Sequence, residues 1–295
     1  MKPAIAVVDV HGTYKVHTEF YASPTARKTI ILVNGSLATT AAFAQTVKYL
    51  NTQFNVVLYD QPYAGQSKPH NNHSRPITKE DEASILLELI EHFKVDYLQS
   101  FSWGGVAAML ALSQRPPRIE KAVITSFSPL LNQPMLDYLE KGLENLQAVD
   151  GVGLGHLVND TIGKYLPSLF KRFNHRHISS LDEHEYRQMY AHVNQVVHME
   201  NHCDMKCLAG IKIPVLFVNG EHDEYTPPED VRVLADHLSA CQFATIDNAG
   251  HFLDMEHKAA WLQSRDLLLG FLQGSPQRER VYRPYHPELQ HAMAV

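Results

Sequence analysis

The sequence alternates between short, continuously apolar runs and longer segments in which apolar residues recur every three or four positions. The runs 29–33, 55–59 and 121–126 are typical of strands buried on both faces, as in a parallel sheet covered by helices. The segments 39–50 and 80–93 have helical spacing. Strands that alternate with helices predict right-handed crossovers, and therefore an α/β protein with a mainly parallel sheet flanked by helices.

The same patterns extend the prediction toward both ends of the chain. Residues 4–10 and 14–20 are predicted to form a hairpin around the turn residues 11–13. Further predicted strands cover 95–101, 213–218 and 241–246, and further predicted helices cover 104–114 and 259–272. The sixth predicted strand, 121–126, is therefore followed by a long interruption.

That interruption is predicted to be a helical cap. Residues 130–208 are rich in histidine, tyrosine, leucine and methionine, and the segments 135–146 and 185–198 have helical spacing. Open α/β sheets bind ligands beyond the carboxyl ends of their strands, so we expect the insertion to cover that edge. The predicted organisation is a core of residues 1–129 and 209–273, a cap of residues 130–208, and a poorly ordered tail of residues 274–295.

The strongest chemical signal is Ser100-Phe-Ser102-Trp-Gly104-Gly105, between a predicted strand and a predicted helix of small residues. This strand–turn–helix context is that of a nucleophile elbow, which exposes a serine hydroxyl at the edge of the sheet. The usual pattern is G-x-S-x-G, and Ser100 replaces its first glycine. Ser102 is the candidate nucleophile, and a buried structural serine is the alternative interpretation.

Two downstream loops carry the other groups that a serine nucleophile needs. Asp223 follows the predicted strand 213–218 and His251 follows the last predicted strand, in the order serine, acid, histidine of the α/β-hydrolase fold. His251 would accept the serine proton, and Asp223 would orient the imidazole and stabilise its charged form. Three nearby carboxylates are alternatives to Asp223 as the acid: Glu221, Glu224 and Asp254.

Such a site also needs backbone N–H groups that bind an oxyanion. We expect them from Trp103, the residue after the nucleophile, and from Ser36 or Leu37 in the loop after strand 29–33. Without the triad, this loop would indicate only a turn. The segment 60–67 resembles the D-x-R-G-x-G-x-S loop of this superfamily and is expected to support the site entrance.

Composition narrows the class of protein. The net charge of −6 gives no general attraction for nucleic acid. No apolar run approaches the ~20 residues that cross a bilayer, and the first residues lack the features of a signal peptide, so we expect a cytoplasmic protein without a transmembrane segment. Three cysteines, Cys203, Cys207 and Cys241, make no disulfide framework.

A metal site is an alternative use of the 18 histidines. The candidate ligands lack the C-x2-C and H-E-x-x-H spacings of zinc sites; they are His175, His177, His198, His202, Cys203 and Cys207. We therefore expect neither a metal nor a cofactor.

The predicted cap combines apolar and basic side chains. Most of its apolar residues are expected to form the core of the cap, and some to line a trough for a long acyl chain; the candidates are Met135, Leu136, Leu139, Leu166, Leu169, Phe170 and Phe173. Basic side chains are usually only solvated, but in an acidic protein a cluster of them could guide an acidic carrier protein or a nucleotide phosphate. That cluster is Lys164, Lys171, Arg172 and Arg176.

Several short stretches between about residues 28 and 270 together resemble the bacterial rhamnosyltransferase RhlA family. They are Leu32-Val-Asn-Gly35 with Ala38-Thr-Thr40, Phe54-Asn-Val-Val-Leu58, Ala64-Gly-Gln-Ser67, Ser102-Trp-Gly-Gly105, Leu131-Asn-Gln133 with Met135-Leu-Asp-Tyr138, Gly163-Lys-Tyr-Leu-Pro167, Asp223-Glu-Tyr-Thr226 and Gly250-His-Phe-Leu-Asp254. The family shares the serine at position 100. Its serine, aspartate and histidine fall on Ser102, Asp223 and His251.

The resemblance implies an acyltransferase. Family members join two (R)-3-hydroxyacyl groups, delivered as thioesters on acyl carrier protein or coenzyme A, into a 3-(3-hydroxyalkanoyloxy)alkanoic acid, the lipid precursor of rhamnolipid biosurfactants. The implied partners are these thioesters, acyl carrier protein and the rhamnosyltransferase that uses the product, with loose attachment to the inner membrane left open. Two functions remain as alternatives: a thioesterase or esterase with the same triad, and a non-catalytic subunit that presents lipid to a glycosyltransferase.

Overall fold

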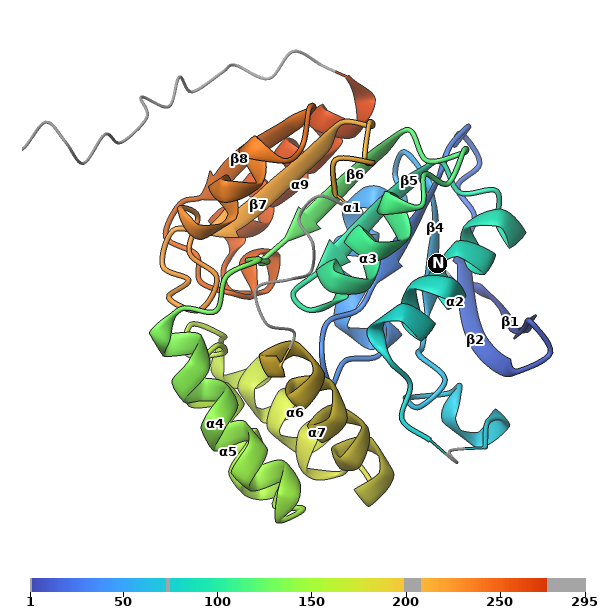
Figure 1. Cartoon of the computed structure of the whole chain (residues 1–295). Helices are drawn as coiled ribbons and strands as arrows, with labels where there is room; N and C mark the ends of the chain where they lie inside the picture. The colour runs from blue at the N-terminus through green and yellow to red at the C-terminus, as the bar shows by residue number, and fades with distance from the viewer. Residues whose placement is uncertain (1, 73–74, 199–207, 275–295) are drawn as a thin grey trace, which may run out of the picture.

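The computed structural model describes residues 2–72, 75–198 and 208–274, and its centre is one eight-stranded sheet (Figure 1). The strand order is β1-β2-β4-β3-β5-β6-β7-β8. Strand β2 is antiparallel to both of its neighbours, and all other pairs are parallel. The strands are β1 (Ala4–Val10), β2 (Tyr14–Tyr21), β3 (Thr29–Val33), β4 (Asn55–Tyr59), β5 (Tyr97–Phe101), β6 (Lys121–Thr125), β7 (Val215–Gly220) and β8 (Cys241–Ile246). The predicted mainly parallel sheet is confirmed.

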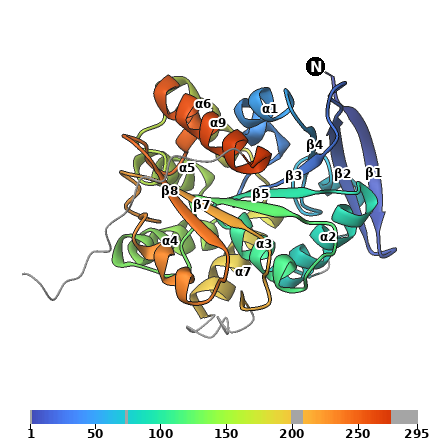
Figure 2. The ribbon, with the colours of Figure 1, turned by 90° about the horizontal axis from the view of Figure 1, so that it is seen from above.

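Helices cover both faces of the sheet. Figure 2 shows α1 and α9 on one side and α2 and α3 on the other. Their bounds, with those of the short 3₁₀ helices, are η1 (Thr40–Phe43), α1 (Ala44–Leu50), η2 (Lys68–His70), α2 (Lys79–His92), α3 (Gly104–Ser113), η3 (Asp230–Asp236), η4 (Leu253–Met255) and α9 (Lys258–Gln273). The predicted helix 39–50 is thus divided into η1 and α1.

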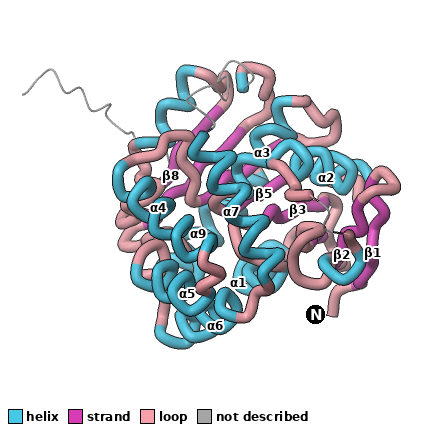
Figure 3. The backbone as a smooth tube through the Cα atoms, turned by 60° about the horizontal axis from the view of Figure 1, so that its bottom comes forward, coloured by secondary structure: helices cyan, strands magenta, loops and turns pink. Residues whose placement is uncertain are grey.

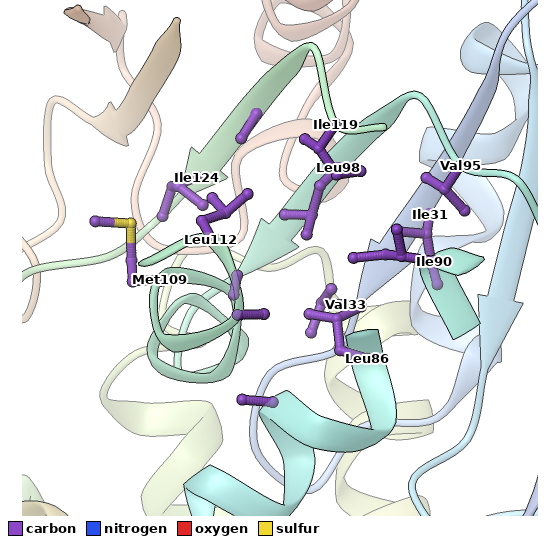
Figure 4. Close-up of a cluster of buried hydrophobic side chains, with 14 of the residues drawn as sticks. Ile31, Val33, Leu86, Ile90, Val95, Leu98, Met109, Leu112, Ile119 and Ile124 are labelled. Carbon is purple, nitrogen blue, oxygen red and sulfur yellow. The ribbon is translucent and has the colours of Figure 1, made fainter. Parts of the chain in front are cut away.

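The central strands are apolar along their length because each of their faces packs against a helical layer. In β3, all five residues are buried. Alternate side chains go to the two layers: Ile31 and Val33 join the cluster under α2 and α3, whereas Ile30 and Leu32 join the one under α1 and α9. Figure 4 shows the first cluster, with Leu86 and Ile90 of α2 facing the strands.

Helices α4 to α7, in the described part of the chain between β6 and β7, form the predicted insertion after the sixth strand, which is confirmed (Figure 3). They are α4 (Gln133–Gln147), α5 (Gly151–Asp160), α6 (Ser168–Ser179) and α7 (Glu183–His198). Asn132 caps the start of α4, and its side chain accepts a hydrogen bond from the backbone N–H of Met135. The cap helices share their own hydrophobic cluster.

A buried polar cluster joins cap helix α7 to core helix α2. The side chain of Gln188 bonds the backbone N–H and carbonyl of Ile77 at 2.9 and 2.8 Å. Nearby, Glu82 accepts a hydrogen bond from Tyr63 at 2.6 Å and pairs with the buried Lys79 at 2.8 Å. The cap is therefore attached to the core by hydrogen bonds as well as by the chain connections. The predicted tail lies outside the described residues from position 275 onward.

A very close contact between a helix and the sheet occurs at the start of α3. A Cβ atom at Gly104 would lie 2.4 Å from the carbonyl oxygen of Asn34 and 2.7 Å from that of Val33. Both obstacles are backbone atoms of a buried segment, so neither can rotate away. Only glycine allows α3 to begin so close to β3.

We expect Gly104→Ala to lower the free energy of unfolding by about 2 kcal/mol or more, because the methyl group must displace backbone. The matched control is Gly270→Ala in α9, where a Cβ would meet nothing within 4 Å and where alanine should stabilise the helix by roughly 0.5–1 kcal/mol. Urea unfolding of both variants measures the difference. Equal stabilities would contradict the proposed role of this contact.

Candidate active site

Ser102 lies at the turn between β5 and α3. Its φ angle is +52°, in the left-handed region that non-glycine residues rarely adopt. The backbone N–H of Ser102 donates to Thr125 in the neighbouring β6 at 2.9 Å, and its carbonyl accepts from Gly105 at 2.8 Å. These bonds hold the strained turn, and the local structure is the predicted elbow.

The structure brings the three predicted triad residues together from three separate loops. His251 Nε2 lies 3.0 Å from Ser102 Oγ, and His251 Nδ1 lies 2.8 Å from Asp223 Oδ2. All three residues follow the carboxyl ends of parallel strands, β5, β7 and β8, which meet at one edge of the sheet. This arrangement can pass a proton from the serine hydroxyl to the imidazole.

Asp223 is buried and held by several donors. Besides His251, it accepts hydrogen bonds from the Thr226 hydroxyl at 2.5 Å and from the backbone N–H groups of Tyr225 and Thr226 at 3.0 and 3.1 Å. Burial by itself would raise the pKa of Asp223, but the attraction of His251 and these hydrogen bonds outweigh it and lower the pKa. The carboxylate therefore stays ionised next to the imidazole.

Two groups fix the loop that carries His251, and sequence reasoning missed both. The carboxylate of Glu256 accepts from the N–H groups of Gly250 and Phe252, on either side of the histidine, at 2.7 and 3.0 Å. The Ser126 hydroxyl donates to the carbonyl of His251 at 2.6 Å. Because these partners are backbone atoms, no sequence motif signals them.

The three alternative acids occupy other positions. Glu221 accepts from the backbone N–H of Asn248 at 2.7 Å, and Glu224 pairs with Lys164 at 2.8 Å. Asp254 accepts hydrogen bonds from side chains of α1. The carboxylate that contacts the imidazole of His251 is that of Asp223.

The predicted oxyanion loop lies beside the nucleophile. A Cβ at Gly35 would be 3.1 Å from the Cβ of Ser102, so the loop and the elbow are in close contact. Within the described part of the chain, the backbone N–H groups of Ser36, Leu37 and Trp103 donate no hydrogen bond, and all three residues line the same cavity as Ser102. These N–H groups are available for a developing oxyanion.

The loop 60–67 supports this region, as its sequence predicted. The buried carboxylate of Asp60 accepts from the backbone N–H groups of Thr40 and Gln66, both at 2.8 Å. It thereby ties the loop to η1, which borders the cavity.

A cavity of about 480 Å³ lies between core and cap, and Ser102 and His251 open into it. Five of the predicted acyl-binding residues line it: Met135, Leu139, Leu166, Phe170 and Phe173. The predictions for Leu136 and Leu169 are wrong, since these side chains are 37% and 51% exposed and do not line the cavity. Each directly precedes or follows an inward residue on its helix, and neighbouring positions point about 100° apart.

Part of the core side of this cavity is polar, which the sequence did not indicate. Asp254 accepts hydrogen bonds from Thr46 and Tyr49 of α1 at 2.9 and 3.0 Å, and burial raises its pKa. Two other lining side chains, Gln99 and Ser264, each have a buried oxygen atom with no hydrogen-bond partner among the described residues. This wall therefore offers unsatisfied polar groups to whatever fills the cavity.

The predicted basic cluster is divided by the structure. Lys164 is paired with Glu224, and Lys171 is half-buried, whereas Arg172 and Arg176 are exposed on α6. In the described ranges, no three histidine, cysteine or acidic side chains gather as metal ligands. His202, Cys203 and Cys207 lie outside those ranges, and the structure describes only the backbone of His198. None of the described helices combines the length and apolar character needed to cross a membrane.

Comparison with known proteins agrees with this geometry. Residues 28–258 match the family model described as alpha/beta hydrolase fold. A deep-sea metagenomic α/β hydrolase, MGS-M2, superimposes with a TM-score of 0.74 at 19% identity, covering 100% of that protein and 94% of this one. A hydrolase from Pseudomonas aeruginosa gives 0.72 at 17% identity, with 98% and 91% covered. At these identities the likeness shows the fold alone.

Two sequence relatives are much closer, and both are named (R)-3-hydroxydecanoyl-ACP:CoA transacylase. The protein of Pseudomonas aeruginosa is 58% identical over 96% of its own length and 98% of this chain. That of Pseudomonas putida is 56% identical over 100% of both proteins. Their names are those of transacylases, whereas the motif resemblance pointed to the rhamnosyltransferase RhlA family. The chain belongs to the alpha/beta hydrolase fold family, and within that fold it is an acyltransferase.

Proposed function

We propose that this enzyme transfers (R)-3-hydroxyacyl groups from acyl carrier protein to coenzyme A through an acyl-enzyme on Ser102. The observation that carries the proposal is the hydrogen-bonded series Ser102–His251–Asp223, which opens into a largely apolar cavity. The names of the relatives supply the donor, the acceptor and the acyl class.

In the first half-reaction, Ser102 Oγ attacks the thioester carbonyl while its proton moves to His251 Nε2. The N–H groups of Trp103 and of Ser36 or Leu37 stabilise the oxyanion. The carbon–sulfur bond then breaks, and the sulfur of the carrier takes the proton from His251 as it leaves. Asp223 keeps the imidazole oriented and stabilises its transient positive charge.

In the second half-reaction, coenzyme A enters in place of the carrier. His251 accepts the proton of its thiol, and the sulfur attacks the acyl carbon of the ester on Ser102. The carbon–oxygen bond breaks, and the proton returns from His251 to Ser102 Oγ. One thioester is consumed and one is formed, so the exchange requires no further reactant.

Transfer has to compete with hydrolysis, because water could take the place of the thiol. The cap supplies much of the cavity wall, from Met135 on α4 to Val193 on α7. An apolar wall that also holds the acyl chain keeps water scarce around the ester and positions it for the acceptor.

A second candidate acceptor is the 3-hydroxyl of another hydroxyacyl thioester, as the resemblance to the rhamnosyltransferase RhlA family implies. His251 would deprotonate this hydroxyl in the same way, and the product would be a 3-(3-hydroxyalkanoyloxy)alkanoic acid once the remaining thioester is hydrolysed. The observation in its favour is that apolar side chains line the cavity from both the cap and the core, at Leu139 and Leu268 for example.

Product analysis distinguishes these functions. Purified enzyme is incubated with (R)-3-hydroxydecanoyl-acyl carrier protein and coenzyme A, and the products are measured by mass spectrometry. We expect 3-hydroxydecanoyl-coenzyme A. An ester-linked dimer would identify the hydroxyl as acceptor, free 3-hydroxydecanoic acid alone would identify a thioesterase, and no turnover would favour a lipid-presenting subunit.

Ser102→Ala should lower acyl transfer by about 10⁴-fold or more, because no acyl-enzyme can form. The matched control is Ser100→Ala in the same motif: the Ser100 hydroxyl is buried and has no hydrogen-bond partner among the described residues, so its loss should leave transfer and stability nearly unchanged. Circular dichroism checks that both variants are folded. Near wild-type transfer by Ser102→Ala would contradict the assignment.

Asp223→Asn should lower kcat by about 10⁴-fold, because the amide favours the wrong imidazole tautomer.

Asp223→Asn should also change how the free energy of unfolding depends on pH in acid. Since the folded-state pKa of Asp223 lies below 3.8, its stabilising effect is complete above pH 3.8 and is lost as the pH falls through the folded-state pKa.

The unfolding free energies of wild type and Asp223→Asn should therefore converge as the pH is lowered below 3.8. Urea unfolding at neutral pH and at several lower pH values measures this convergence. A difference that stays constant or widens on acidification would show that Asp223 is not a stabilised carboxylate.

A further inference from the structure

Cap helix α6 presents a mixed apolar and basic stripe to solvent. Leu169 and Phe173 are 51% and 52% exposed, and Arg172 and Arg176 are exposed as well. These four residues have i, i+3, i+4, i+7 spacing, which places them on one face of a helix. They are called the α6 stripe below. Apolar side chains that are exposed next to one another and rimmed by polar residues are a feature of interaction surfaces.

The charge of this helix is opposite to that of the whole protein. Helix α6 (Ser168–Ser179) contains three lysine or arginine residues and no acidic residue, in a protein with a net charge of −6. Among the described residues, no carboxylate lies within ion-pair distance of Arg172 or Arg176. The guanidinium of Arg176 instead lies over the ring of Phe173, 5.9 Å from its centroid. The stripe is therefore a local positive surface with both arginines available.

The α6 stripe borders the catalytic cavity. The adjacent side of the helix lines the cavity with Phe170, Asn174 and His177, and His177 Nε2 lies 2.7 Å from the carbonyl oxygen of Leu37 in the loop after β3. Phe173 belongs to both surfaces, because it lines the cavity and is half-exposed. A protein bound to the stripe would therefore lie at the edge of the cavity into which Ser102 opens.

We propose that the α6 stripe is the docking surface for an acidic acyl carrier protein. This inference rests on the proposed function, which requires such a donor. Acidic side chains of the carrier would pair with Arg172 and Arg176, and apolar ones would contact Leu169 and Phe173. The flexible arm of the docked carrier then has only to pass Phe173 to bring its thioester into the cavity.

The composition of the stripe favours a protein over a membrane surface. A helix that lies in a bilayer interface needs a broad, continuous apolar face. Here the two apolar side chains are interleaved with two arginines, and the side of the helix with Phe170 and Asn174 already lines the cavity. Interspersed charges and a few apolar contacts are typical of transient protein–protein recognition.

The first experiment measures binding and does not depend on turnover. Fluorescently labelled (R)-3-hydroxydecanoyl-acyl carrier protein is titrated with enzyme carrying Ser102→Ala, with and without Arg172→Glu and Arg176→Glu. We expect the two charge reversals to weaken binding by about tenfold or more. Added salt should weaken the parent complex and affect the reversed variant much less.

The matched control carries the same charge change at the opposite edge of the sheet. Arg115 and Lys212 are exposed and precede the amino ends of β6 and β7, far along these strands from the cap, and no ion pair of either is seen among the described residues. Arg115→Glu with Lys212→Glu should leave carrier binding within about twofold of the parent, because long-range effects of net charge are screened. Leu169→Ser tests the apolar part of the stripe, since Leu169 does not line the cavity.

The second experiment separates docking from chemistry in the active enzyme. We expect the Arg172→Glu/Arg176→Glu variant to have a raised KM for the carrier-bound donor and unchanged kinetics with 3-hydroxydecanoyl-pantetheine, which has no protein body. Equal loss with both donors would overturn the proposal, because the arginines would then support the cavity itself.

Unchanged carrier binding by the charge-reversed variant would also overturn the proposal. So would a stripe-dependent association with phosphatidylglycerol-containing vesicles in the absence of any effect on the carrier, which would identify a membrane surface. If the wild type transfers no acyl group from either donor, the proposed function fails, while the titration still decides whether the stripe binds the carrier.

Discussion

The close approach of Gly104 to the backbone of β3 is the constraint on which the rest of the site depends. It places the first turn of α3 directly against the carbonyl groups of Val33 and Asn34. Ser102, which precedes α3, and the loop after β3 are thereby held in contact, with Gly35 against Ser102. A helix that began even one methyl group farther out would move the Ser102 hydroxyl away from the N–H groups that we propose stabilise the oxyanion.

A second constraint is electrostatic. Asp223 and His251 are 2% and 3% exposed, and an ionised carboxylate at such a depth is costly unless it is fully hydrogen-bonded. The turn after β7 meets this requirement with two backbone N–H groups and the Thr226 hydroxyl, and the imidazole supplies the fourth donor. The carboxylate of Glu256 accepts from the N–H groups of Gly250 and Phe252 and thereby fixes the loop that carries His251.

Most of the core was predictable from the sequence because its signals are local. Apolar runs bounded by turn residues marked the strands to within a few residues, and the parallel topology then required that Ser102, Asp223 and His251, each just beyond a strand, share one edge of the sheet. The packing of the cap was harder to predict, because helical spacing indicates that a face is apolar without indicating what covers that face. That is why Leu169 was assigned to the acyl trough although it lies on the solvent side of α6.

Other features were hidden because their partners are distant or are backbone atoms. Nothing near Thr46 or Tyr49 in the sequence indicates that both would bond Asp254, more than two hundred positions away. The sequence also gives no sign that Glu256 supports the loop of His251, because any residue can supply a backbone N–H. Sequence motifs identify the groups that react, whereas the groups that hold them appear only when the fold is known.

Helix α6 contributes to two surfaces of the cap, one that lines the cavity and one that faces solvent. Its inward side, with Phe170, contributes to the apolar wall, and its outward side, with Arg172 and Arg176, is positively charged. Both sides belong to one helix, and that helix also contacts the loop after β3 at Leu37. A carrier bound to the outer side would therefore have a fixed position relative to Ser102. Under the proposed function, the core would supply the series Ser102–His251–Asp223, and the cap would restrict which acyl donor and how much water reach Ser102.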